Sequence, residues 1–162
     1  METTTLTFLR HATAQDRALG LPDESRRLVD KGKKQMQRVA DFCKQRQLIP
    51  AYLLCSPLVR ARETAQALQK NLSACPNPKM VSWLANTDPD TMQAELEKLA
   101  NSGLNDLWLV GHEPDFSSLI SQLLGRREAI IKVKKASLIR LEVDFQTGIG
   151  ELQWSIPNTL MK

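Results

Sequence analysis

Cysteine and aromatic residues are scarce in this chain of 162 residues, and each scarcity excludes a class of protein. The three cysteines, Cys43, Cys55 and Cys75, are odd in number and have no close-paired spacing, so neither a disulfide framework nor a zinc site is indicated. Aromatic residues make up 5% of the chain and do not interleave with cations as in single-strand nucleic-acid binders. We therefore expect reduced cysteines, no metal and no nucleic-acid partner.

Long apolar runs are missing from the sequence as well. No stretch approaches the length of a membrane span, and the N-terminus lacks a basic region followed by an apolar core and a cleavage site. We therefore expect no membrane partner and a cytoplasmic location. The 42% apolar and 25% charged content is normal for a globular protein, and the length predicts one domain over residues 1–162.

Negative charge is in slight deficit, because the formal net charge is +4. The basic residues gather in two segments, Arg26 to Arg38 and Arg126 to Lys135. Two interpretations stay open at this point. The segments are either solvated faces or a positive rim that attracts a phosphorylated or acidic partner.

Only two histidines are present, and both follow extended, β-prone segments. Leu6–Leu9 leads into Arg10 and His11, and residues 107–111 lead directly into His112. If both strands belong to one parallel sheet, their carboxyl ends lie at the edge where open α/β sheets place their ligands. A long polar stretch, residues 13–29, starts right after His11, so we expect it to border the same site.

The hydrophobic periodicity predicts helices that alternate with strands over about 125 residues. We expect helices from Asp30, as the cap, to about Gln47; from Ser56-Pro57, with Pro57 at the first position; near 92–99; and from 113–115 to Gly125. Short strands are expected at 51–55 and 80–84, and a hairpin at 139–145 and 151–156, where apolar and polar residues alternate. The predicted fold is α/β, a mainly parallel sheet with helices on both faces and antiparallel C-terminal hairpin strands.

This arrangement brings three segments to one sheet edge. They are Arg10-His11, the segment Ser56 to Arg60 at a helix start, and Gly111-His112. Two arginines, two imidazoles and a helix N-terminus suit a dianion such as phosphate. One imidazole can attack phosphorus while the other supports the transferring oxygens.

The same segments carry a family resemblance. Leu9-Arg10-His11-Ala12, the run from Ser56 to Ala65 (SPLVRARETA) and the run from Val110 to Asp115 (VGHEPD) resemble the three signature segments of the histidine phosphatase superfamily. Within that superfamily the chain is similar to the small SixA-type phosphohistidine phosphatases, and the likeness extends over essentially its whole length. The resemblance implies a phosphoglycerate mutase-like fold without a cap insertion.

The resemblance also implies roles for individual residues and no cofactor. His11 would be the residue that becomes phosphorylated, and Arg10, Arg60 and His112 would bind the phosphate. Two departures stand out: Ala12 replaces the glycine of the wider superfamily, and Val29 replaces the usual threonine before the first helix.

The general acid of mutase-like relatives has no clear counterpart in this chain. Asp88 and Asp90 occupy roughly the matching region and are candidate general acids, but the run from Asn86 to Asp90 also reads as plain helix capping. Glu113 and Asp115 near His112 make a poor metal set, and capping accounts better for Asp115.

The sequence therefore predicts a cytoplasmic, cofactor-free protein histidine phosphatase that acts in signal transduction through a phosphohistidine intermediate on His11. Its expected partner is a protein phosphorylated on histidine, and its oligomeric state is left open. Two alternatives remain: a phosphatase for small phosphoesters, and a non-catalytic phosphoprotein-binding module of the same fold.

Overall fold

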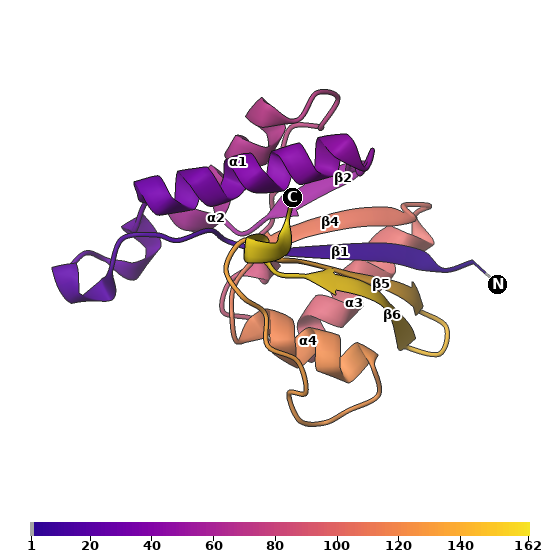
Figure 1. Cartoon of the computed structure of the whole chain (residues 1–162). Coiled ribbons are helices and arrows are strands. Elements are labelled where there is room, and N and C mark those ends of the chain that lie inside the picture. The colour runs from indigo at the N-terminus through magenta and orange to yellow at the C-terminus, as the bar shows by residue number, and fades with distance from the viewer. Residues whose placement is uncertain (1) are drawn as a thin grey trace.

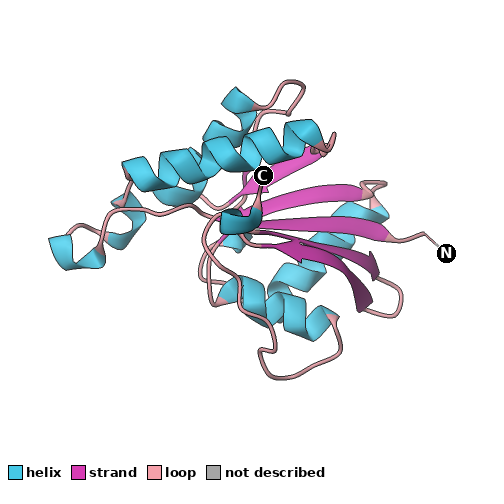
Figure 2. Ribbon diagram, in the orientation of Figure 1, coloured by secondary structure: helices cyan, strands magenta, loops and turns pink. Residues whose placement is uncertain are grey.

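One mixed sheet of six strands organises the computed structural model, which describes residues 2–162 (Figures 1 and 2). The strands are β1 (Thr4–Arg10), β2 (Tyr52–Cys55), β3 (Lys79–Met80), β4 (Asp106–Gly111), β5 (Leu138–Asp144) and β6 (Ile149–Ile156). Their order is β3-β2-β4-β1-β5-β6, with the first four parallel and the β5–β6 hairpin antiparallel. The predicted fold class and the predicted hairpin are confirmed.

Four α-helices cover the two faces of this sheet. They are α1 (Asp30–Gln45), α2 (Val59–Asn71), α3 (Pro89–Asn101) and α4 (Asp115–Leu123). Helices α1 and α2 lie together on one face, and α3 and α4 lie on the other (Figure 1).

The alternation of side chains along each central strand divides the core into two layers. On β1, Leu9 packs with the α1 and α2 residues while its neighbour Phe8 packs with α3 and α4. On β4, Trp108 and Leu109 divide between the layers in the same way. Both faces of β1 and β4 are therefore apolar, as a doubly covered parallel sheet requires.

The strand register aligns the residues that follow three strands. Arg10 pairs with Gly111 and Cys55 pairs with Val110, so β1, β4 and β2 end level with one another. The next residues, His11, His112 and Ser56, consequently lie side by side at one edge. The N–H of His11 donates to the Gly111 carbonyl at 3.0 Å, which continues the ladder one residue beyond the strand.

Two predicted element boundaries are wrong. The strand expected at 80–84 is only Lys79–Met80, because β3 pairs with just the last two residues of the short strand β2; the chain then forms a 3₁₀ turn, Ser82–Leu84, that buries Leu84. The second helix starts at Val59 rather than at Ser56-Pro57, with Leu58 extended in front of it.

The expected caps differ as well. Asp30 lies in the first turn of α1 and Val29 takes the N-cap position, so Asp30 makes no side-chain cap hydrogen bond. At α4 the cap hydrogen bond comes from Glu113, whose Oε1 accepts from the Ser117 N–H at 2.8 Å. Asp115 instead accepts from the Thr87 N–H at 3.5 Å. Across residues 2–162, no helix has the length and apolar character needed to cross a membrane.

Candidate active site

His11 sits at the carboxyl end of β1 with only 5% of its surface exposed. Its Nδ1 lies 2.8 Å from the carbonyl oxygen of Ala12. A carbonyl oxygen can only accept, so Nδ1 carries the proton and Nε2 keeps its lone pair. Burial lowers the pKa of His11 to about 3, assisted by the positive environment of His112, Arg60 and Arg10. His11 is therefore a neutral imidazole with an unprotonated Nε2 at physiological pH.

His112 occupies the matching position after β4 and is equally buried. Its Nε2 lies 2.7 Å from the Ser56 hydroxyl, which also accepts from the Leu58 N–H at 3.2 Å. The hydroxyl proton is thus free to point at Nε2, which favours the tautomer of His112 that is protonated on Nδ1. The SPLVR segment places Ser56 and so orients the second imidazole.

The two imidazoles face each other across the strand ends. Their ring centroids are 5.3 Å apart and the rings are tilted by 50°. Burial lowers the pKa of His112 to about 4, and the charges of Arg60 and Arg10 lower it further. The predicted convergence of the two histidines is confirmed.

Arg60 lies in the first turn of α2 and is 4% exposed. Its guanidinium donates to two oxygens of Asp23, the backbone carbonyl at 2.8 Å and Oδ2 at 3.2 Å. The charge of Arg60 reaches both imidazoles strongly enough to depress their pKa values. Arg60 therefore lies near both histidines, and its role in binding phosphate stays a prediction.

The polar stretch 13–29 borders the site, as expected, through Asp23 in the 3₁₀ turn Asp23–Ser25. Asp23 bridges Arg60, the buried Arg26 at 3.0 Å and the exposed Arg17 at 3.5 Å. Partial burial raises the pKa of Asp23, but the three arginines outweigh it and hold the pKa below the usual value. Asp23 is thus an anionic clamp that positions Arg60.

Sequence reasoning did not identify Asp23, Arg26 or the orienting role of Ser56. Ser56 lies inside the second signature segment, so that motif contained a signal for it. Asp23 and Arg26 stand in a polar stretch without periodicity, and only the folded chain shows what they contact.

Arg10 links the site to the loop before β5. Its guanidinium donates to the Val133 carbonyl at 2.9 Å, and its own carbonyl accepts from the Ala136 N–H at 3.0 Å. Burial lowers the pKa of Arg10, and Glu113 partly opposes that shift. The Arg10 side chain is half-buried, and these contacts hold it beside His11.

Three donor atoms at the site are buried and have no hydrogen-bond partner within residues 2–162. They are Nε of Arg10, Nε of Arg60 and Nδ1 of His112. Such groups are rare in folded proteins, and each needs a reason. Two guanidinium N–H groups and one imidazole N–H are the kinds of donor that bind an oxyanion in proteins.

The candidate general acids, Asp88 and Asp90, make hydrogen bonds with residues other than the two histidines. Asp88 is the N-cap of α3 and accepts from the Thr91 N–H at 2.8 Å and its hydroxyl at 3.0 Å. These hydrogen bonds lower the pKa of Asp88, so it holds its negative charge rather than a proton. Asp90 accepts from the Gln122 side chain at 3.1 Å. The structure joins neither aspartate to the histidines by a hydrogen bond.

Residues 2–162 contain no group of three or more His, Cys, Asp or Glu side chains that could hold a metal ion. All three cysteines are free and buried.

Comparison with known proteins identifies the class of this chain. Residues 6–82 match the family model described as the histidine phosphatase superfamily, branch 1. An uncharacterized protein of Picosynechococcus sp. is 32% identical over 157 residues, which cover 96% of this chain and 92% of the relative. The chain belongs to the histidine phosphatase superfamily, and this membership supports activity as a phosphatase hydrolase.

The solved structures that resemble the fold include a SixA enzyme. The structure of the protein histidine phosphatase SixA complexed with tungstate covers 98% of this chain and 100% of its own, with a TM-score of 0.86 and 22% identity. The structure described as a putative alpha-ribazole-5'-P phosphatase of Escherichia coli covers 97% and 98% respectively, with a TM-score of 0.76 and 15% identity. The shared fold thus spans a protein phosphatase and a small-molecule phosphatase.

Proposed function

We propose that this protein hydrolyses phosphohistidine on proteins through a covalent phosphohistidine intermediate on His11. The observation that carries the proposal is the state of His11: a buried, neutral imidazole with its proton fixed on Nδ1 and its Nε2 lone pair free. An attacking nitrogen must be unprotonated, and this environment keeps it so across the physiological pH range.

In the proposed first step, Nε2 of His11 forms a bond to phosphorus as the bond from phosphorus to the substrate imidazole breaks. The electron pair of that bond stays on the substrate nitrogen, and the proton on the other ring nitrogen of the substrate makes the leaving group a neutral imidazole. Arg10, Arg60 and His112 stabilise the nonbridging oxygens with the three donor atoms that have no partner among residues 2–162. Water then attacks the phosphorus, releases inorganic phosphate and restores neutral His11.

The leaving group decides between the substrate classes. A phosphohistidine that is protonated on its other ring nitrogen releases neutral imidazole, whose conjugate acid has a pKa of about 6.5, whereas an aryl ester releases a phenolate whose conjugate acid has a pKa of about 10. Imidazole needs little proton donation, and the two candidate acids accept hydrogen bonds, Asp88 from Thr91 and Asp90 from Gln122. These contacts favour phosphohistidine as the substrate.

A phosphatase for small phosphoesters is the second candidate, because the similar structures include one described as a small-molecule phosphatase. That function requires a competent acid for a more basic leaving group. The partner protein, a role in signal transduction and the cytoplasmic location remain predictions.

Trapping of the intermediate tests the proposal. Brief incubation with a ³²P-labelled phosphohistidine peptide, followed by quenching without acid, should leave enzyme-bound label that acid releases and alkali does not. His11→Ala should abolish the label. Label that survives in His11→Ala and disappears in His112→Ala would reverse the assigned roles. Phosphate affinity without label or turnover would support the non-catalytic binding module.

A panel of substrates separates the two catalytic candidates. Rates should fall steeply in the order phosphohistidine peptide, aryl phosphate, phosphoserine peptide. Efficient hydrolysis of phosphoserine or of small alkyl phosphates, without turnover of phosphohistidine, would favour the small-ester function.

A further inference from the structure

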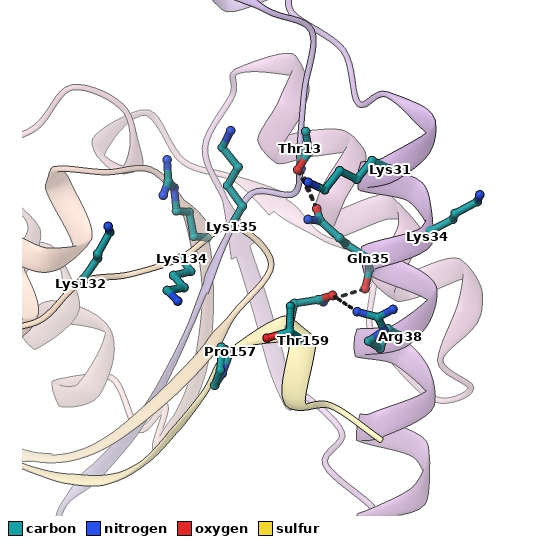
Figure 3. A pocket seen from close by; sticks show the side chains of 12 residues that line it. Thr13, Lys31, Lys34, Gln35, Arg38, Lys132, Lys134, Lys135, Pro157 and Thr159 are labelled. Atoms are coloured by element: carbon teal, nitrogen blue, oxygen red, sulfur yellow. Dashed lines mark hydrogen bonds between the residues drawn. The ribbon is translucent and has the colours of Figure 1, made fainter.

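A groove of about 740 Å³ opens beside the active site, between α1, the loop before β5 and the C-terminal segment (Figure 3). Seven of its twelve lining residues are lysine or arginine, and no carboxylate is among these described lining residues. The function proposed above uses only one of the seven, Arg10. The other six form a charged surface that phosphoryl transfer does not need.

One wall of the groove is the loop before β5. Val133 and Ala136 are fully buried, and the two backbone hydrogen bonds to Arg10 attach this loop to the end of β1. The residues between and beside them, Lys132, Lys134 and Lys135, are exposed and line the groove. The same contacts that position Arg10 thus fix these lysines next to the catalytic residues.

The opposite wall is one stripe of α1. Lys31, Lys34 and Arg38 follow one another at spacings of three and four residues, so they share a face of the helix. Arg38 is held by a 3.1 Å hydrogen bond to the Asn158 side chain, and Lys31 and Lys34 are exposed. Figure 3 shows these side chains across the groove from Lys132 and Lys134.

The positive field is concentrated where the groove meets the site. Burial lowers the pKa of Lys135, and the charges of Arg10, Arg26 and Lys31 lower it further. The negative charge of Asp16 opposes this effect. An anion in the groove is therefore attracted by both walls and by the end of the groove that holds Arg10.

The residue types that line the groove restrict which kind of ligand it can bind. None of the described lining residues is aromatic, so the groove lacks a stacking platform for nucleobases. Most of its cations are exposed lysines, which are strongly hydrated point charges on flexible stems. Such a surface suits dispersed carboxylates on a protein partner better than a single tightly held group.

We propose that this groove binds a carboxylate-rich surface that flanks the phosphohistidine of the substrate protein. The inference rests on the proposed function for the identity of the phosphorylated residue. The groove steers the acidic partner so that its phosphohistidine reaches His11 beside Arg10, and it selects among phosphohistidine proteins by the charge of their surroundings.

Binding of peptides that cannot be hydrolysed tests the groove independently of turnover. The probe is a fluorescein-labelled peptide with an unphosphorylated histidine flanked by aspartate and glutamate, compared with one carrying asparagine and glutamine instead. By fluorescence anisotropy at low salt, the acidic peptide should bind at least about tenfold more tightly. Its affinity should fall as salt is added, because exposed charges are screened.

Charge-matched variants separate the groove from net charge. The quadruple variant Lys31→Gln, Lys34→Gln, Lys132→Gln and Lys134→Gln should lose that preference. The control, Lys33→Gln, Lys44→Gln, Lys70→Gln and Lys79→Gln, removes the same charge from exposed lysines outside the groove and should keep it. Equal losses in both variants, or equal binding of both peptides by the wild type, would overturn the proposal.

Two further arms identify other occupants. Phosphatidylserine vesicles that bind the wild type but not the quadruple groove variant, with no binding of the acidic peptide, would make the groove a membrane contact instead. Tripolyphosphate that binds there while the peptide does not would make it a small-polyanion site. Either result overturns the proposal.

Turnover separates failure of the groove from failure of the proposed function. With phosphohistidine in both peptides, kcat/KM should favour acidic flanks in the wild type and in the control variant only. Hydrolysis of both peptides at equal rates would refute the groove proposal and leave the proposed function supported. Preferential binding of the acidic peptide without any phosphohistidine turnover would refute the proposed function and leave the groove as a binding surface for acidic proteins.

Discussion

Acidification from pH 7 to pH 5 should destabilise this protein, and the two active-site histidines should cause most of the loss. Both are neutral in the folded protein, where their pKa values are lowered from 6.5 to about 3 for His11 and about 4 for His112. In the unfolded chain each takes up a proton as the pH falls below 6.5. Their contribution to stability is therefore complete above pH 6.5 and is lost progressively as the pH falls toward the folded values.

The magnitude follows from linkage. Between pH 7 and pH 5, an unfolded histidine with a pKa of 6.5 becomes almost fully protonated while each folded histidine stays neutral. This difference costs roughly 2 kcal/mol for each histidine and about 4 kcal/mol for the pair. Such a loss is a large fraction of the 5–15 kcal/mol by which domains are typically stable.

Urea unfolding at closely spaced pH values in phosphate-free buffer measures the effect, since a bound anion would itself alter the titration. The chain has only two histidines, so His11→Gln and His112→Gln should each remove about half of the pH dependence. Burial raises the pKa of Asp106 and Asp115, which act in the opposite sense as the pH falls. A double histidine variant that keeps the wild-type loss would refute the reasoning.

The remaining predictions concern the anion and the leaving group. Arg60→Ala should lower kcat/KM for a phosphohistidine peptide by about 100- to 1000-fold, measured by phosphate release, because it removes a preorganised donor; a near-normal rate would remove Arg60 from the reaction. Orthovanadate at one hundred times its Kd should add about 2.7 kcal/mol to the stability of the wild type and so raise its melting temperature. In Arg60→Ala the rise should be far smaller. Asp88→Asn should leave both phosphohistidine turnover and the melting temperature nearly unchanged, because asparagine caps a helix about as well as aspartate; slowed turnover would show a catalytic role for Asp88.

Local hydrophobic patterns in the sequence predicted most of the helices and strands. The spacing of Met36, Val39, Ala40 and Cys43 located α1, and the alternation in the last two segments located the β5–β6 hairpin. The errors fell where partners decide the conformation. Met80 to Leu84 has a plausible strand pattern, but β2 offers β3 only two residues for pairing, so the rest of that segment turns inward.

The candidate site divides in the same way. The sequence alone determined that two strand ends carry histidines, because strand termini leave a local signal, and the motifs around Arg10, Arg60 and His112 added their resemblance. Only the tertiary structure decided the chemical state of these groups. The pKa of His11, the Ser56 hydrogen bond to His112 and the Asp23 clamp on Arg60 all arise from contacts across 37 to 101 positions of sequence. Burial and charge at a point in space depend on the packing of the whole sheet edge, and no local pattern encodes them.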